Sequence, residues 1–143
     1  MKTALKTNRD RGLLLVEAAI ILPIVFLLLS VIFNGKQMLD NRKEAFSAVY
    51  EGVQWIAAQK ASTPAMTDAT GISKAQTKVQ DLLATECFNC SNITATATIN
   101  PFPNPPGGRY MDITLVYDFG IFFFTIPGVA QLTFTVNGSG AYD

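Results

Sequence analysis

The feature that most constrains this chain is an apolar block of 21 residues, residues 13–33. Glu17 is the charged residue of the block, which also contains Pro23 and Ser30. A helix of this length spans about 30 Å, which matches the hydrocarbon core of a bilayer. The block therefore predicts a transmembrane helix, and it holds much of the apolar excess of a chain that is 49% hydrophobic.

Residues 1–12, which precede the block, form a basic leader. Four of their side chains are basic and one is acidic, namely Lys2, Lys6, Arg9, Arg11 and Asp10. A cleaved secretory signal fits poorly, because its apolar core is only about 7–15 residues long and a small-x-small site follows it. The basic residues before the block favour a cytoplasmic N-terminus.

Residues 34–60 continue the helical periodicity beyond the block. Apolar side chains at helical spacing predict an apolar stripe on one face, and polar side chains fill the other faces. The stripe consists of Leu39, Phe46, Val49, Val53 and Ile56. We therefore expect one long helix that is apolar on all sides in its first half and amphipathic in its second.

Residues 61–143 predict a small α+β head, in which a short helix packs on an antiparallel sheet of three or four strands. A loop is expected at 61–71, and the short helix should run from Ile72 to near Cys87. Alternating β-branched residues predict strands at 93–99, 110–119 and 132–136. A proline- and glycine-rich segment at 100–108 predicts a loop.

The apolar run at 120–128 is too short to cross a bilayer. One interpretation is a core strand followed by a turn at Pro127 and Gly128. The other is an exposed surface that packs on another subunit or on lipid. The sequence leaves both interpretations open.

Cys87 and Cys90 form a C-x-x-C pair and are the two cysteines of the chain. A zinc site would need two further cysteine or histidine ligands, which the sequence lacks. A thioredoxin-like redox pair would need a strand-to-helix placement, whereas this pair lies where a helix ends and a strand begins. We therefore predict a local structural disulfide, which requires an oxidising compartment outside the cytoplasm.

Histidine is absent from the chain, and its 11 basic residues equal its 11 acidic residues in number. Histidine-based general base catalysis, Ser-His-Asp triads and histidine-ligated metal sites are thereby excluded. The neutral balance argues against a nucleic-acid partner that is bound through a basic field. Because no nucleophile motif or phosphate-binding loop occurs, the sequence predicts a protein that is not an enzyme and uses no cofactor and no metal.

The N-terminal segment carries a combination of residues that few families share. Arg11 and Gly12 precede four apolar residues, and Glu17 stands at the fifth position after the glycine. Pro23 then precedes a leucine-rich run. This combination, over residues 9–33, resembles the class III signal of type IV pilin-like proteins, and most closely the TadE-like pseudopilins of tight-adherence (Tad, Flp pilus) systems.

The resemblance implies a pilin-like fold and a structural role in assembling or anchoring a pilus or secretion filament. It implies that a prepilin peptidase removes the basic leader by cutting between Gly12 and Leu13. The implied partners are other pilins or pseudopilins, which pack through the N-terminal helix, together with the prepilin peptidase, an inner-membrane assembly platform and membrane lipid. The implied location is the cytoplasmic (inner) membrane, with a single span, the N-terminus in the cytoplasm and the head outside.

Glu17 has two interpretations. A carboxylate near a helix N-terminus gains about 0.3–1 kcal/mol from the helix dipole, and its side chain can reach towards the membrane interface. Under the resemblance, the carboxylate pairs with the new α-amine of Leu13 in a neighbouring subunit and sets the register of assembly. An unpaired acid inside the membrane costs about 2.5–3.5 kcal/mol, which favours the pairing.

Two alternative functions remain. Major Flp pilins usually carry an aromatic residue after the glutamate and are much shorter, whereas this chain has Ala18 and a sizeable head. These differences favour a minor pilin or pseudopilin, with a major pilin subunit as the first alternative. The second alternative is a single-pass anchored binding or accessory domain outside the cytoplasm.

Overall fold

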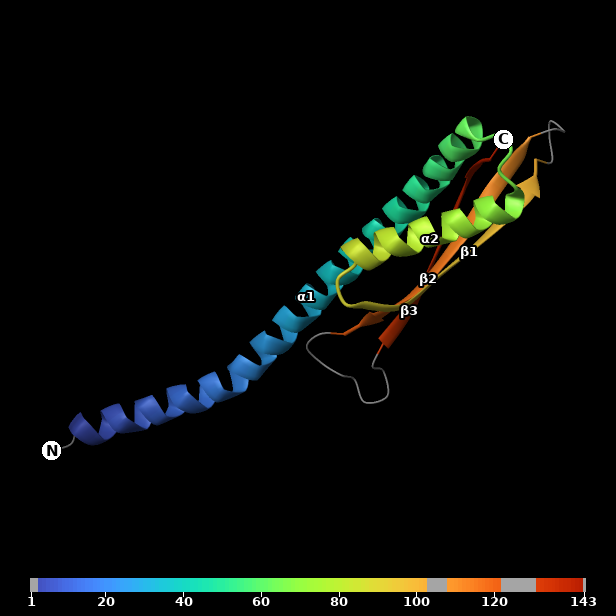
Figure 1. Ribbon diagram of the computed structural model, residues 1–143. Coiled ribbons are helices and arrows are strands. Elements are labelled where there is room, and N and C mark those ends of the chain that lie inside the picture. The colour runs from blue at the N-terminus through green and yellow to red at the C-terminus, as the bar shows by residue number, and fades with distance from the viewer. Residues whose placement is uncertain (1–2, 103–107, 122–130, 143) are drawn as a thin grey trace. The chain divides into compact units, whose positions relative to one another are not determined.

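The computed structural model describes residues 3–102, 108–121 and 131–142, with the side chains of residues 3–13 excepted. Its elements are α1 (Thr3–Ser62), α2 (Asp68–Glu86), β1 (Cys90–Pro101), β2 (Arg109–Gly120) and β3 (Gln131–Ala141). The three strands of the described residues form one antiparallel sheet in the order β1-β2-β3 (Figure 1). The predicted α+β class is therefore confirmed.

Internal contacts divide the chain into two compact units, Met1–Lys36 and Gln37–Asp143. We call the first the N-terminal unit and the second the head. Helix α1 continues through Pro23 and contributes its first half to the N-terminal unit and its second half to the head. The prediction of one long helix is therefore confirmed.

Helix α1 begins at Thr3, ten residues before the predicted start of the helix at residue 13. The leader contains residues with high helix propensity, such as Ala4, Leu5 and Lys6, and no proline. Nothing in the local sequence therefore prevents the helix from extending through it.

The face of α1 that packs within the head differs in part from the predicted stripe. Of that apolar stripe, Val49, Val53 and Ile56 are buried, whereas Leu39 and Phe46 are exposed. The other buried positions are occupied by small or polar residues, namely Asn41, Ala45, Ala48 and Gly52. Hydrophobic periodicity does not reveal such positions, because these side chains carry little apolar surface.

Helix α2 begins at Asp68, four residues before the predicted start at Ile72. The side-chain oxygen of Thr67 caps the helix by accepting a hydrogen bond from the Thr70 N–H at 3.4 Å. The loop between the helices is correspondingly shorter than predicted. The buried residues of α2 recur every four positions and are Gly71, Ala75, Val79 and Leu83.

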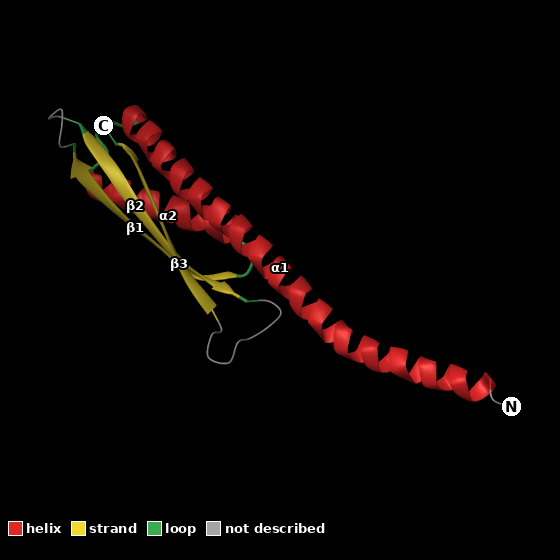
Figure 2. Ribbon diagram, turned by 180° about the vertical axis from the view of Figure 1, so that it is seen from behind, coloured by secondary structure: helices red, strands yellow, loops and turns green. Residues whose placement is uncertain are grey.

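The sheet buries one face. Alternate residues of β2 are buried in the core: Met111, Ile113, Leu115, Tyr117 and Phe119. Helix α2 lies over β1, and Figure 2 shows the sheet in front of this helix. The opposite face of the strands carries mainly threonine, asparagine, serine and aspartate, so it suits contact with water.

Strand β3 runs to Ala141, beyond its predicted end at residue 136, because its last residues stay paired with β2 up to Ala141 opposite Tyr110, and α1 packs on its glycines. A Cβ atom added at Gly138 would lie 2.5 Å from Cγ1 of Val49, and one added at Gly140 would meet Cγ1 of Val53. Glycine weakens a strand, but it also marks close approach of another element. The second half of α1 therefore crosses β3 where side chains on the strand are missing.

Helix α1 follows the sheet from one end of the head to the other. Near the start of its head segment, Asn41 contacts the Phe88 backbone, just before β1 begins. Near its end, the Lys60 ammonium group lies 5.5 Å from the ring centroid of Tyr142, whose N–H donates to the Arg109 carbonyl. We call the first region the disulfide end of the head and the second the Arg109 end.

Candidate functional site

The first candidate site is the apolar half of α1. Large apolar side chains are exposed on all sides of the helix there, and Ile21, for example, is 56% exposed. Among the described residues, α1 is the one helix that is long and apolar enough to cross a membrane, and it lies near the N-terminus. Lipid or neighbouring helices would cover this surface favourably, whereas contact with water is costly.

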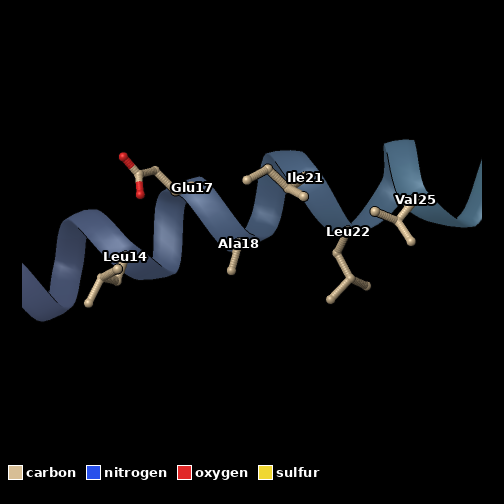
Figure 3. Close-up of a pocket in the computed structure, with 6 residues that line it drawn as sticks. All are labelled: Leu14, Glu17, Ala18, Ile21, Leu22 and Val25. Atoms are coloured by element: carbon tan, nitrogen blue, oxygen red, sulfur yellow. The ribbon is translucent and has the colours of Figure 1, made fainter.

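Glu17 lies within this apolar surface. Figure 3 shows its carboxylate on the same side of the helix as Ile21, with Leu14, Ala18 and Leu22 on the other side. Together with Val25, these side chains border one shallow groove along the helix. Because Ala18 is small, a second helix could approach the backbone closely beside the carboxylate.

Gly12 and Leu13, the predicted cleavage pair, both lie within α1. A protease binds its substrate in an extended form, so cleavage here requires local unwinding of the helix. Glycine costs a helix about 1 kcal/mol relative to alanine, which makes Gly12 a favourable place to unwind.

The second candidate site is the loop formed by residues 87–90. Cys87 caps the C-terminus of α2 and Cys90 begins β1, as the sequence predicts. Their sulfur atoms lie at disulfide distance and their Cα atoms are 5.8 Å apart, which is usual for a disulfide. Closing so short a loop stabilises the fold by about 2 kcal/mol in the chain-entropy model.

Paired hydrogen bonds hold this loop against the rest of the head. The buried Asn41 amide donates to the Phe88 carbonyl at 2.8 Å and accepts from the Phe88 N–H at 3.2 Å. The Asn89 amide donates to the Gly120 carbonyl at 2.8 Å, and the Gly120 N–H donates to the Asn89 carbonyl at 3.1 Å. The loop is therefore tied to α1 on one side and to β2 on the other.

A group of carboxylates lies between the two helices of the head. The side-chain hydrogen bond with Glu44, assisted by desolvation and by repulsion from Glu44 and Glu51, raises the pKa of Glu86 above its usual 4.5. Lys78 opposes this shift and pairs with Glu51 at 3.4 Å. The group is exposed to water and its charges are partly balanced by Lys78, which fits a solvated helix surface better than a reaction centre.

Asp118 lies on the polar face of the sheet, and both oxygens of its carboxylate accept hydrogen bonds from neighbouring strands. The Thr133 hydroxyl donates to it at 2.6 Å and the Asn92 amide donates at 2.8 Å, and both hydrogen bonds lower the pKa of Asp118. The carboxylate thus links the two outer strands across the central one. Over the residues that the structure describes, no group of three or more Cys, Asp or Glu side chains could hold a metal ion.

The apolar run at 120–128 is only partly described. Gly120 ends β2, and Ile121 follows it half-buried. Residues 122–128 lie outside the described residues, so both interpretations of the run stay predictions.

Comparisons with protein-family models, with curated proteins and with solved structures found no match for this chain. Its function is therefore inferred from the residues and geometry described above.

The residues that tie the disulfide loop in place were not predicted from the sequence. Asn41 lies in a run of polar and charged residues, and Asn89 occupies a variable position within the C-x-x-C pair, so neither stands out in the sequence. One signal was available for Asn41, because Asn41, Ala45, Ala48 and Gly52 follow helical spacing as small or short side chains. A stripe of this kind indicates close packing rather than an exposed face.

Proposed function

We propose that this chain is a structural pseudopilin or minor pilin of the TadE-like kind, which takes part in assembling or anchoring a Tad/Flp-type pilus or secretion filament. Its first half of α1 serves as membrane anchor and as packing surface, and its head stands outside the cytoplasmic membrane. Its partners are other pilins or pseudopilins, the prepilin peptidase and the membrane assembly platform.

The observation that carries the proposal is the difference between the two halves of α1. The same helix has an apolar, uncovered first half and a second half that forms part of the core of a small α+β head. A pilin-like subunit needs both, because its helix must pack in a membrane or filament while its head folds independently. The acidic residue Glu17 inside the apolar half is the feature that a simple anchor does not need.

Glu17 supports assembly through its energetic cost. An unpaired carboxylate within the membrane costs about 2.5–3.5 kcal/mol, and a neighbouring α-amine would offset this cost. After cleavage, Leu13 carries that amine four residues before the glutamate, on the same face of the helix. Pairing between adjacent subunits would therefore fix their stagger.

The second half of α1 also carries aromatic side chains that its own head leaves uncovered. Phe46 and Tyr50 are one helical turn apart and are 47% and 66% exposed. The Arg42 guanidinium lies 5.7 Å from the Phe46 ring centroid, which covers only part of it. In a single-pass anchor, the exposed rings of Phe46 and Tyr50 would stay in contact with water. Subunits that pack side by side would bury them.

The expected orientation follows from the two ends of the helix. The basic leader favours the cytoplasmic side, and the disulfide requires an oxidising compartment for the head. Non-reducing mass spectrometry of the exported protein should find Cys87 and Cys90 joined. Two free thiols would contradict this orientation.

N-terminal sequencing of the membrane-extracted protein, from cells that contain a prepilin peptidase, tests the proposal directly. We expect a mature chain that begins at Leu13. A chain that retains Met1 would instead favour the plain anchored domain. Abundance in sheared surface fibres would separate the major pilin alternative from a minor subunit.

The role of Glu17 is tested by Glu17→Ala, with Glu17→Gln as a variant of similar shape. We expect filament assembly or co-purification of partner subunits to fall by about tenfold or more, given the energy of an unpaired intramembrane charge. Glu51→Ala on the same helix is the matched control and should leave assembly unchanged. Normal assembly of Glu17→Ala would contradict the pairing.

A further inference from the structure

The polar face of the sheet carries a compact set of hydrogen-bonding side chains at the Arg109 end. They form two neighbouring cross-strand rows, of which the first is Thr98, Asp112 and Ser139 and the second is Thr96, Thr114 and Asn137. Facing residues of adjacent strands have Cβ atoms about 4.5–5.5 Å apart, and successive rows are about 7 Å apart. Hydroxyl, carboxylate and amide groups from all three strands are therefore close enough to bind one small molecule together.

An open groove with a volume of about 390 Å³ lies over these rows, within the range of about 300–1,000 Å³ that is usual for ligand sites. The side chains on the polar face that line it are Thr98, Asp112, Thr114, Asn137 and Ser139. A second groove, of about 280 Å³, is lined by Phe102, Tyr110 and Ser139 among others. Because Ser139 lines both, the two grooves adjoin, and we call them together the sheet groove.

Two aromatic rings lie beside the polar rows. The ring centroids of Phe102 and Tyr110 are 5.2 Å apart, and the rings are tilted by 42°. Tyr110 pairs across the strands with Asn100, whose amide donates to the Asp112 carboxylate at 2.8 Å. A ring contact, a strand pair and a hydrogen bond thus connect Phe102 to Asp112, so the sheet groove is continuous from its aromatic part to its polar part.

Two aspartates on the same face of β2 differ in how their oxygens are used. Both carboxylate oxygens of Asp118 accept hydrogen bonds, from Asn92 and from Thr133. In Asp112, Oδ2 accepts the hydrogen bond from Asn100, and over the described residues no group of the protein donates to Oδ1. Asp112 is half-buried and lines the sheet groove. Its Oδ1 is therefore an acceptor that a ligand in the groove can use, whereas the acceptors of Asp118 are taken by its own sheet.

The groups in the sheet groove match the chemistry of a neutral saccharide. Sugar hydroxyls both donate and accept hydrogen bonds, as do the hydroxyls of the groove and the Asn137 amide, and a carboxylate such as that of Asp112 accepts from them. The apolar C–H face of a sugar ring packs against aromatic rings, which Phe102 and Tyr110 supply beside the polar groups.

The charge of the sheet groove excludes other ligands. Among the described residues that line it, Asp112 is the charged one, and its negative charge repels phosphates and acidic sugars. A metal ion would need more carboxylates, and the described part of the chain brings no three acidic or cysteine side chains together. A neutral, hydroxyl-rich ligand is the class that remains.

We propose that the sheet groove binds a neutral oligosaccharide. Asp112, through Oδ1, and Asn137 bind the hydroxyls of one sugar ring, and Phe102 and Tyr110 pack against the apolar face of the next ring. The site lies wholly within the head. The proposal therefore goes beyond the assembly role and does not depend on cleavage after Gly12.

Titration with trisaccharides, followed by NMR of the threonine methyl groups, tests the proposal. The full-length protein is reconstituted in phosphatidylcholine nanodiscs, because glycoside detergents would compete for the groove. The probes are maltotriose, cellotriose and mannotriose. We expect at least one of them to shift the methyl signals of Thr98 and Thr114 saturably in the millimolar range, because an open groove covers only part of its ligand. Thr133 and Thr135, on the same face but outside the groove, should keep their signals.

Two matched variants assign the binding to Asp112. In Asp112→Asn, an N–H group replaces a carboxylate acceptor at nearly unchanged shape, so we expect binding to weaken by about tenfold or more. Asp118→Asn makes the same change on the same strand, where both oxygens already have protein partners, and should leave binding unchanged. Phe102→Ala removes the exposed ring and should weaken binding by about threefold to tenfold.

Four results would overturn the proposal. The first is that none of the three trisaccharides shifts the signals of Thr98 and Thr114. The second is that Thr133 and Thr135 shift equally, which would mean that the sugar contacts the sheet without a defined site. The third is equal binding by Asp112→Asn and Asp118→Asn. The fourth is that the signals of Thr98 and Thr114 move with protein concentration and not with sugar, in which case a second copy of the chain occupies the groove.

Discussion

The two halves of α1 have the same backbone conformation and opposite surroundings. In the N-terminal unit, large branched side chains such as Leu22 and Ile24 are exposed. In the head, the buried face depends on small residues such as Ala45, Ala48 and Gly52, against which other elements pack. Both halves of α1 therefore form helix, but they differ in side-chain size and in burial. Large side chains are exposed in the first half, and small ones are buried against other elements in the second.

The largest expected effect on stability comes from replacing an isoleucine by alanine in each half of α1. Ile56 is fully buried in the head, whereas Ile21 is 56% exposed in the apolar half. We expect Ile56→Ala to lower the free energy of unfolding of the head by about 2–5 kcal/mol, because it removes core contacts and leaves a cavity.

The matched variant Ile21→Ala should change the same quantity by less than about 0.5 kcal/mol. Chemical denaturation in detergent micelles, followed by the fluorescence of Trp55 in the head, measures both. Equal losses for the two variants would mean that the two halves of α1 do not differ as described.

A second pair of variants compares two glycines of α1. A Cβ atom added at Gly52 would meet Cγ2 of Val79, whereas one added at Gly35 has no atom within 4 Å. Gly52→Ala should cost about 1–3 kcal/mol through overpacking, of which about 1 kcal/mol is returned by better helix propensity. Gly35→Ala should gain about 1 kcal/mol, because only the propensity changes.

Hydrogen exchange of the α1 amides measures this pair locally. Exchange around residue 35 should slow by about fivefold in Gly35→Ala, and exchange around residue 52 should quicken in Gly52→Ala. Faster exchange at both sites would show that Gly35 is packed like Gly52, against the structure.

The smallest expected effects concern two carboxyl groups of the head with opposite shifts. The pKa of Asp118 is lowered, so the folded state holds its proton less tightly than the unfolded chain does, and its stabilising contribution is present above the usual pKa of 3.8 and lost as the pH falls. The pKa of Glu86 is raised, so its contribution is full below 4.5 and is lost as the pH rises through the raised pKa.

Melting temperatures over a range of about pH 3 to pH 7 separate the two groups. Asp118→Asn should weaken the fall in stability at the acid end, and Glu86→Gln should weaken the decline above pH 4.5. Both effects should be small, since both carboxyl groups are exposed to solvent and screened. The slope of melting temperature against pH should therefore change in opposite directions in the two variants. A change of the same sign in both slopes would contradict the hydrogen bonding described for Asp118 and Glu86.

Much of the fold was predictable from local pattern. Hydrophobic periodicity predicts the long helix and the strands, whose apolar and polar residues alternate. Periodicity and turn residues together also place the cysteines between a helix and a strand. The start of α2 was missed because the Thr67 cap was read as part of a loop, and the length of β3 was missed because Gly138 and Gly140 resemble turn residues. The candidate site was predicted at Glu17 and at Cys87 and Cys90, but the asparagines that hold the disulfide loop were not.

The sequence by itself determined where the chain is helical, where it alternates as a strand, and which stretch is apolar enough to span a membrane. These properties depend on neighbours within a few residues, and their signals are therefore present in the order of the side chains. Tertiary structure alone decided which face of α1 is buried, why Gly138 and Gly140 are needed, and that Asn41 binds the Phe88 backbone. Those outcomes depend on segments that are distant in sequence, such as residues 41 and 88 or 49 and 138, and small or polar side chains carry no periodic hydrophobic signal that would show where they meet.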